Sequence, residues 1–501
     1  MKRFIIYLIG VFACGCSLEE GTPYGQFTNQ SFYQTKEDAL SALRYAYQAL
    51  HDIDYCGRFL QNLNDLTTDA CIVYPGKYIE SLVVNWEITP ETDEILYFFK
   101  YAYMSNNRAL SVIENVSKMD GITTSDRNQI VGEAHFLLGF NYFMLVRMYG
   151  EVPVRREAIK SISQIHAPKS SIQDVYAFII ENLEAAIGLT EIQKLQGRGD
   201  KVAAQATLAK VYLTMASSKK TEVPGYEWVD SDDCYRLAAE YALEVLEKQS
   251  TYALDPDLLN IYDVDHYIDG CEHIFMTSMN RDTDGSTWSV LPQMFGCGYP
   301  EFYISKELDG NGGGASQVQR WIGYTMNCWS SYCPSPKFYG EYNDADWRKK
   351  LFVTTIYDKN GNVLDTYNPN SSIFYFPMVR KFTDPHSTTT TTSANLDLIR
   401  FAEVALTYAE AAGPTEKGYY WLNQVRARAG LPALSGLSSA AYEEAVWREN
   451  ILEFAYEGKH LFELRRTNRV NSANITLKTI KPEYAYFFPL PQREIDLNDG
   501  L

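Results

Sequence analysis

Apolar residues recur at three- and four-residue steps through both ends of the 501-residue chain, and this pattern restricts the fold more than any other feature. Such spacing places one apolar stripe along an α-helix. The segment 132–148 is followed by Gly150 and Pro153, which favour a helix end at that point. The predicted helices comprise residues 31–50, 132–148, 171–189, 201–216, 232–246, 395–412, 419–429 and 440–466.

Alanines stand beside large aromatic residues at many of these helical positions. In 232–246, for example, Ala238 and Ala242 are one helical turn apart. Small side chains at packing positions let two helices approach closely, as they do in tetratricopeptide-type helix pairs. The spacing of the segments is irregular. The predicted fold is therefore mainly α, with a divergent tetratricopeptide-like helical repeat scaffold.

The helical periodicity fades between residues 251 and 394. Residues 310–314 are rich in glycine, and Asp358-Lys359-Asn360-Gly361 separates two short β-prone runs, which predicts a small β-hairpin. Binding residues lie mostly on loops that a rigid scaffold holds in place. We therefore predict that 251–394 is a long loop-rich insertion lobe that contains small β-hairpins and faces the ligand. The other predicted divisions are a signal peptide at 1–15, a tether at 16–30, an N-terminal helical scaffold at 31–250, and a C-terminal helical part at 395–501 that packs on this scaffold.

The first twenty residues have the form of an export signal. Lys2 and Arg3 precede an apolar run that is shorter than the roughly twenty residues needed to span a bilayer. The run closes on Ala13-Cys14-Gly15-Cys16, which predicts a lipoprotein acylated at Cys16. Cys14 is a competing site, and an ordinary secretory signal is the alternative. Because no later apolar run approaches membrane-spanning length, we expect the lipid alone to tether the chain to a membrane.

The overall charge excludes some partners. The formal net charge of −18 argues against binding to nucleic acid, because clustered lysine and arginine residues are what binds the phosphate backbone. It also disfavours contact with an anionic lipid surface.

The cysteines do not indicate a disulfide scaffold or a zinc site. Of the nine cysteines, Cys14 is removed with the signal and Cys16 is the expected lipid site, which leaves an odd number. We interpret most of the remaining thiols as buried, and any pairing among them stays open. They are Cys56, Cys71, Cys234, Cys271, Cys297, Cys328 and Cys333.

Carboxylates gather in two places, but neither pattern is typical of a catalytic or metal site. Glu449, Glu453 and Glu457 recur every four residues, which suggests acid–base chemistry or, more simply, charge pairs on a helix surface. A glycosidase needs two carboxyl groups that face each other across a sugar. A weaker pattern allows calcium but lacks the EF-hand glycine and spacing; it comprises Asp255, Asp257, Asp263 and Asp265. We predict no catalytic residue and no cofactor, and a metal site only in this weak calcium form.

Several segments, in order, resemble motifs of the SusD/RagB family of outer-membrane nutrient-binding lipoproteins. The acidic residues after Cys16 are also similar to the surface-export signal of Bacteroidetes lipoproteins. The resemblance extends nearly from end to end. The matching segments are 31–40, 46–47, 132–142, 149–153, 197–204, 212–213, 400–403, 408–410, 423–430, 453–458, 464–466, 488–491 and 494–495.

The resemblance implies a location and a task. Members of this family sit on the outer face of the outer membrane, at the mouth of a SusC-like TonB-dependent transporter. They capture oligosaccharides, or in some members peptides, and pass them to the channel without catalysing a reaction. Two alternatives stay open for this chain: capture of peptides, and cleavage of glycans by an extracellular enzyme.

The family also implies the kind of ligand site. Sugar rings stack on aromatic side chains that loops supply, while amides and carboxylates bind the hydroxyl groups. For each single aromatic residue the alternative is a structural place in the core. The candidate aromatic residues are Tyr74, Trp288, Trp329, Tyr78, Trp86, Tyr299, Trp321 and Tyr332. The candidate polar residues are Asp69, Asn85, Arg320 and Asn327.

Overall fold

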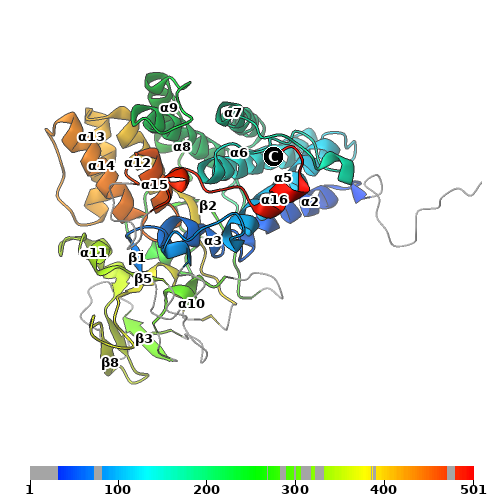
Figure 1. Ribbon diagram of the computed structural model, residues 1–501. Coiled ribbons are helices and arrows are strands. Elements are labelled where there is room, and N and C mark those ends of the chain that lie inside the picture. Colours follow the sequence, from blue (N-terminus) through cyan, green and yellow to red (C-terminus); the bar gives the residue numbers. More distant parts are fainter. Residues whose placement is uncertain are drawn as a thin grey trace, which may run out of the picture.

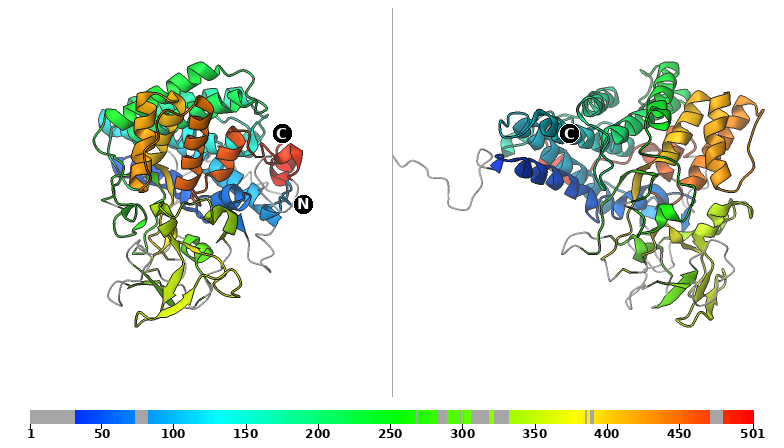
Figure 2. Two further views of the ribbon diagram at one scale, coloured as in Figure 1. Left: turned by 90° about the vertical axis from the view of Figure 1, so that its left-hand side faces the viewer. Right: turned by 180° about the vertical axis from the view of Figure 1, so that it is seen from behind.

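The protein has a helical body and a smaller lobe that contains most of the strands. Figure 1, a computed structural model, shows the helices in the upper part and this lobe below them, and Figure 2 shows the same division from two further sides. Among the residues that the structure describes, no helix is long and apolar enough to cross a membrane. These residues are 32–72, 82–267, 269–282, 289–297, 299, 301–305, 318–321, 332–384, 386–387, 391–470 and 480–501.

The N-terminal half of the body consists of long helices that pack against one another. Helix α6 contacts both α5 and α7, while α8 packs on α9, and α2 on α5. All five helices predicted here are confirmed, whereas α5 was not predicted. The elements are α2 (Lys36–Gln48), α5 (Asp93–Val116), α6 (Thr124–Tyr149), α7 (Ile172–Leu189), α8 (Lys201–Lys220) and α9 (Ser231–Glu247).

Helix α6 is the centre of this half and is buried over most of its surface. Gly139 lets α7 come close, since a Cβ atom at this position would lie 2.6 Å from Leu183 Cγ. Gly150 ends the helix with φ of 71°, a left-handed conformation that glycine adopts without steric cost. The predicted helix end is therefore confirmed.

The C-terminal helices continue the same packing, because α12 lies against both α8 and α9. The prediction for 395–412 was wrong at its start, where Asp397–Arg400 forms strand β10 and pairs with β2. The prediction for 440–466 was wrong in its middle, since Tyr456 and Gly458 have positive φ and interrupt the helix. The elements are α12 (Phe401–Ala412), α13 (Glu416–Arg428), α14 (Ser439–Glu453), α15 (His460–Arg466) and α16 (Gln492–Leu497).

The strands form small antiparallel sheets. The largest has the order β4-β3-β7-β8, and its β7–β8 hairpin turns at residues 358–361, as predicted. Strands β1 and β5, β6 and β9, and β2 and β10 form the other pairs. The elements are β1 (Cys71–Ile72), β2 (His273–Met276), β3 (Phe302–Ser305), β4 (Val318–Trp321), β5 (Cys333–Pro334), β6 (Phe352–Val353), β7 (Thr355–Tyr357), β8 (Val363–Thr366), β9 (Met378–Val379) and β10 (Asp397–Arg400).

The strand lobe has a small apolar core of its own, which includes Phe302, Ile304, Ile356 and Phe374. Strand β2 and helix α10, by contrast, belong to the main core of the body. The short helical elements are η1 (Ala49–His51), α3 (Phe59–Gln61), the π-helix η2 (Asn62–Leu66), η3 (Ile162–Gln164), η4 (Asn260–Tyr262), α10 (Leu291–Phe295), α11 (Pro336–Tyr339), η6 (Trp347–Leu351), η7 (Arg380–Phe382) and η8 (Pro482–Tyr484).

The described cysteines are free thiols, and all except the half-buried Cys271 are buried. This confirms the interpretation of most cysteines as buried thiols. Cys328 lies outside the described residues.

Candidate functional site

Two of the segments that carry candidate ligand-binding residues are joined to neighbouring strands. Strands β1 and β5 pair antiparallel, with Ile72 opposite Cys333. Ile72 is the last described residue before 73–81, and Tyr332 is the first after 322–331. The segments that carry Tyr74 and Trp329 are therefore attached at neighbouring points.

A third segment with a candidate aromatic residue is attached at the same place. Residues 283–288 contain Trp288 and are followed by Ser289 and then by helix α10. The Tyr332 N–H donates to the carbonyl of Met294 in α10 at 3.1 Å. We call this place the β1–β5–α10 junction; Figure 1 shows its three elements between the body and the strand lobe.

Hydrogen bonds hold the junction firmly. The Ser335 hydroxyl donates to the Asp69 carbonyl at 2.5 Å, and the Ser335 N–H donates to the Ala70 carbonyl at 2.9 Å. The same hydroxyl accepts the Phe338 N–H and so caps helix α11. From the body, the Tyr456 hydroxyl donates to the Ala70 carbonyl at 3.2 Å. The loop attachments are therefore fixed to the C-terminal part of the body.

Asp69 supplies a charged group at the junction. Its side chain is 18% exposed and forms an ion pair with Lys337, at 3.0 Å between Oδ2 and Nζ. His460 Nε2 lies 3.8 Å from the other carboxylate oxygen. Burial lowers the pKa of His460, so its ring is neutral at neutral pH. Asp69 can thus accept hydrogen bonds from sugar hydroxyl groups while it contacts the exposed Lys337.

The predictions for Trp86 and Tyr332 were wrong. Trp86 is 2% exposed, and its indole N–H donates to the Thr67 carbonyl at 2.9 Å. Tyr332 is fully buried, with its ring centroid 5.1 Å from that of Phe295. Both side chains fill the main core and are closed to a ligand.

Two other candidates, Tyr299 and Asn85, are accessible in part. Tyr299 is half-buried, and its hydroxyl donates to Asp365 at 2.7 Å. Asn85 is also half-buried. Arg320 and Trp321 belong to strand β4, opposite Tyr303 and Phe302 of β3. Five candidates lie outside the described residues: Tyr74, Tyr78, Trp288, Asn327 and Trp329.

The weak calcium prediction is not supported. Within the described residues, no group of three or more histidine, cysteine, aspartate or glutamate side chains is placed to hold a metal ion. Asp263 lies 3.0 Å from His266, and Asp265 forms an ion pair with Arg281 at 3.1 Å. Asp255 and Asp257 accept hydrogen bonds from nearby backbone N–H groups instead.

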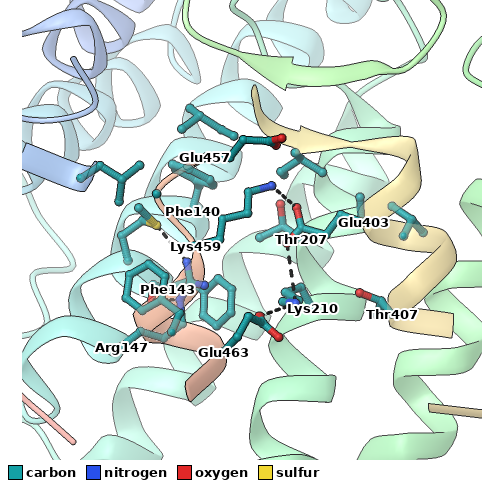
Figure 3. A pocket seen from close by; sticks show the side chains of 18 residues that line it. Phe140, Phe143, Arg147, Thr207, Lys210, Glu403, Thr407, Glu457, Lys459 and Glu463 are labelled. Atoms are coloured by element: carbon teal, nitrogen blue, oxygen red, sulfur yellow. Dashed lines mark hydrogen bonds and ion pairs between the residues drawn. The ribbon is translucent and has the colours of Figure 1, made fainter. Parts of the chain in front are cut away.

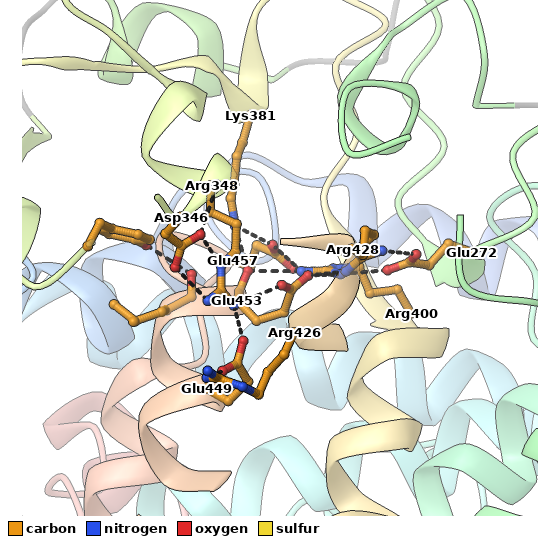
Figure 4. A network of polar contacts seen from close by, with 12 residues as sticks. Glu272, Asp346, Arg348, Lys381, Arg400, Arg426, Arg428, Glu449, Glu453 and Glu457 are labelled. Atoms are coloured by element: carbon orange, nitrogen blue, oxygen red, sulfur yellow. Dashed lines mark hydrogen bonds and ion pairs between the residues drawn. The ribbon is translucent and has the colours of Figure 1, made fainter. Parts of the chain in front are cut away.

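The interpretation of Glu449, Glu453 and Glu457 as surface charge pairs was wrong about their position. All three are at most 2% exposed, and Glu457 lies beyond the end of α14. They belong to a buried ion network that Figure 4 shows between the strand lobe and the C-terminal helices. The sequence did not reveal this network because its cations come from distant segments.

The network is balanced and dense. Arg400 is fully buried and contacts Glu272 at 2.6 Å, Glu453 at 2.8 Å and Glu457 at 3.0 Å. Burial alone would raise the pKa of Glu457, but Arg400 and Lys381 lower it to about 2. Five acidic and five basic residues take part: Glu272, Asp346, Glu449, Glu453, Glu457, Arg348, Lys381, Arg400, Arg426 and Arg428.

A buried carboxyl group that the sequence analysis missed lies behind the junction. Asp65, in the π-helix η2, is fully buried and accepts the Gly458 N–H at 2.8 Å. Burial raises its pKa to about 7. A π-helical turn is rare and often occurs at functional sites. The sequence signal for this site was the run of polar residues within 61–68, in which only Leu63 and Leu66 are apolar.

We expect Asp65 to make the protein less stable as the pH rises from about 4 to about 7. The unfolded chain releases this proton near pH 3.9, whereas the folded protein keeps it to about pH 7. The loss of free energy of unfolding is on the order of 2 kcal/mol, because relaxation around a buried charge reduces the full effect. Chemical denaturation at several pH values measures it. In Asp65→Asn the free energy of unfolding should no longer fall between about pH 4 and about pH 7, whereas the control Asp269→Asn, at an exposed position, should show the same fall as the wild type. If the free energy of unfolding of Asp65→Asn falls as in the wild type, the assignment is contradicted.

A cavity in the helical body is a second possible site. It lies among α6, α8, α12 and the start of α15, and Figure 3 shows the charged groups that face it. Lys210 pairs with Glu463 at 2.8 Å, and Lys459 with Glu403 at 2.5 Å. Its volume of about 40 Å³ admits a few water molecules but no sugar ring. The junction is therefore the better candidate for a sugar site.

Comparisons with known proteins identify the family. A family model described as "SusD family" matches residues 271–501, and one described as "Starch-binding associating with outer membrane" matches residues 54–213. The chain belongs to the SusD/RagB family. The resemblance of the sequence motifs to this family is therefore confirmed.

A curated relative and solved SusD structures agree with this result. SusD-like protein P2 of Formosa agariphila is 25% identical over 99% of this chain and 97% of its own length. A SusD superfamily protein of Parabacteroides distasonis is 20% identical, with a TM-score of 0.74 over 95% of this chain and 99% of that one. Surface glycan-binding protein A of Bacteroides thetaiotaomicron was solved in complex with laminarihexaose. It is 20% identical, with a TM-score of 0.69 over 93% of this chain and 98% of that one. The mainly helical, tetratricopeptide-like SusD fold is thus confirmed.

Proposed function

We propose that this SusD-family protein binds oligosaccharides at the cell surface and delivers them to a SusC-like TonB-dependent transporter for nutrient uptake. Its family membership supports the proposal, as does the solved complex of a structural neighbour with laminarihexaose. The observation that carries it is the common attachment of three aromatic-containing segments at the β1–β5–α10 junction. Aromatic faces that converge on one place suit the apolar faces of sugar rings.

The proposed ligand site consists of the loops at this junction. Trp86 and Tyr332 are no longer part of it, because both are core residues. Asp69 is the described polar group that is best placed to bind sugar hydroxyls. The proposed ligand-binding residues are Tyr74, Tyr78, Trp288, Tyr299, Trp321, Trp329, Asp69, Asn85, Arg320 and Asn327.

The proposed location is the outer face of the outer membrane. One family model carries outer-membrane association in its description, and the N-terminal sequence ends its apolar run on Cys16. We propose that acylation at Cys16 tethers the protein, which then needs no further contact with lipid.

Binding without catalysis is the proposed mode of action. Two of the carboxylates that first suggested acid–base chemistry, Glu453 and Glu457, are buried in ion pairs, where Arg400 and its neighbours hold them ionised. A glycosidase acid needs a raised pKa and an open position beside the substrate. Glu453 and Glu457 have neither.

We expect saturable binding of at least one oligosaccharide with no cleavage. Isothermal titration calorimetry against a panel that includes laminarihexaose measures binding, and chromatography of the recovered sugar measures cleavage. Asp69→Ala should weaken binding about 10- to 100-fold, since a hydrogen bond to a charged group contributes about 1.5–3 kcal/mol. The exposed Asp269→Ala is the matched control. Shortened sugars would favour the glycan-cleaving alternative, and heat released only with peptides would favour peptide capture.

A further inference from the structure

A second, smaller cavity adjoins the one in Figure 3 and shares Arg147 and Phe462 with it. The two cavities differ in charge. Glu403, Glu457 and Glu463 line the first, whereas no acidic residue is among those that line the second. We call the second one the arginine cavity. Its lining consists of Arg147, Thr214, Ser218, Val223, Tyr226, Phe462, Arg465, Arg466, Tyr486 and Phe487.

Arg465 is a buried cation without a carboxylate partner in the described structure. Its side chain is 4% exposed. Its guanidinium donates to the carbonyls of Ala485 at 3.0 Å, Tyr484 at 3.1 Å and Arg147 at 3.3 Å. These bonds fix the C-terminal segment to the body, but carbonyl oxygens do not neutralise the charge.

Arg147, which is half-buried, is a second cation without a carboxylate partner in the described part of the chain. Its guanidinium carbon lies 3.8 Å from the ring centroid of Phe143 and 3.9 Å from that of Phe462. Its Nε donates to the Phe143 carbonyl, and another nitrogen contacts the Met144 sulfur at 2.9 Å. Among the described residues no carboxylate forms an ion pair with it.

The described carboxylates near these two arginines form ion pairs with other cations. Arg466 pairs with Glu410 and with Glu463, at 2.5 Å each. Glu463 also pairs with Lys210. Among the described residues, Arg147 and Arg465 therefore leave two positive charges in excess, in contrast to the balanced network of Figure 4. The undescribed residues 471–479, which lead into the C-terminal segment, contain no aspartate or glutamate.

Helix ends compensate for this excess only in part. Arg147 lies in the last turn of α6, and Ser218 in the last turn of α8. The carboxyl end of a helix carries roughly half a negative charge. Burial lowers the pKa of Arg147 to about 10 and that of Arg465 to about 9, so both remain protonated at neutral pH.

We propose that the arginine cavity binds one chloride-sized anion between Arg147 and Arg465. The volume of about 20 Å³ admits one water-sized particle, which excludes a sugar and favours a halide over phosphate or sulfate. Tyr226 lines the same cavity as both guanidinium groups, and its hydroxyl, 2.9 Å from that of Tyr176, is a third donor. The anion neutralises the excess charge and stabilises the attachment of residues 484–488 to α6 and α15.

Two measurements on the complete protein test this proposal. In crystals soaked in sodium bromide, we expect an anomalous peak in the arginine cavity. In thermal unfolding at constant ionic strength, exchange of gluconate for chloride should raise the melting temperature with saturation, whereas phosphate should not replace chloride. A cavity without a bromide peak, or a melting temperature that does not depend on the anion, overturns the proposal.

Variants separate this site from general salt effects. Arg147→Met should raise the chloride concentration for half-maximal stabilisation about tenfold or more, since it removes a charged hydrogen-bond donor. Tyr226→Phe should raise it less, and Arg236→Met, at an exposed position on α9, should leave it unchanged. An equal chloride response in Arg147→Met and Arg236→Met contradicts the assignment. If Arg147→Met does not fold, the chloride response of Tyr226→Phe and the bromide peak in the wild-type crystal test the proposal instead.

Discussion

Arg400→Met is expected to lower the free energy of unfolding by about 3–5 kcal/mol, because it leaves buried carboxylates without their cation. Arg400 is fully buried and contacts three of them, Glu272, Glu453 and Glu457. Glu272 lies just before β2, Glu453 ends α14, and Glu457 belongs to the segment after α14. Urea denaturation followed by circular dichroism measures the change.

The matched control is Arg236→Met. Arg236 forms two ion pairs, with Asp233 at 2.5 Å and Glu240 at 2.8 Å, but its side chain is 54% exposed. Solvent screens such pairs, so we expect a change below about 1 kcal/mol. Equal losses in the two variants would mean that the buried network is not a main source of stability.

The triple variant Tyr74→Ala, Trp288→Ala and Trp329→Ala is expected to weaken oligosaccharide binding about 100- to 1000-fold. Each ring is proposed to stack on a sugar, and a contribution of about 1–1.4 kcal/mol from each of the three rings corresponds to this factor. Each single variant should weaken binding by a smaller factor. Calorimetric titration with the best ligand of the panel measures the affinity.

We expect the stability of the triple variant to remain close to that of the wild type, because loop side chains that bind a ligand contribute little to the packing of a core. Trp228→Ala is the control for a general aromatic effect, since this exposed residue lies at the body, after α8. Binding that survives in the triple variant, or is lost in Trp228→Ala, would refute the assignment of these residues.

The helical part of the fold could be predicted from the sequence because period and caps are local features. Ser171 caps α7 at the predicted start, and Gly150 ends α6 at the predicted end. The failures have a tertiary cause. Residues Asp397–Arg400 continue an apolar pattern but pair with β2, which lies more than 120 residues earlier in the chain.

The candidate site could be predicted in part for the same reason. Aromatic residues in segments without a period were recognisable, and their common attachment at the junction agrees with a shared role. Burial was not recognisable, since Trp86 and Tyr332 are of the same residue types as the other candidates. Charge pairing was equally hidden: the glutamates at 449, 453 and 457 have the period of an exposed helix face, but their partners Arg348 and Arg400 come from distant segments.

Hydrogen–deuterium exchange of the wild-type protein, with and without a saturating ligand from the panel, tests the location of the site most directly. We predict slower exchange in peptides that contain β1, β5 and the start of α10, together with residues 73–81, 283–288 and 322–331. Protection confined to α6, α8 and α15, around the cavity of Figure 3, would contradict the account.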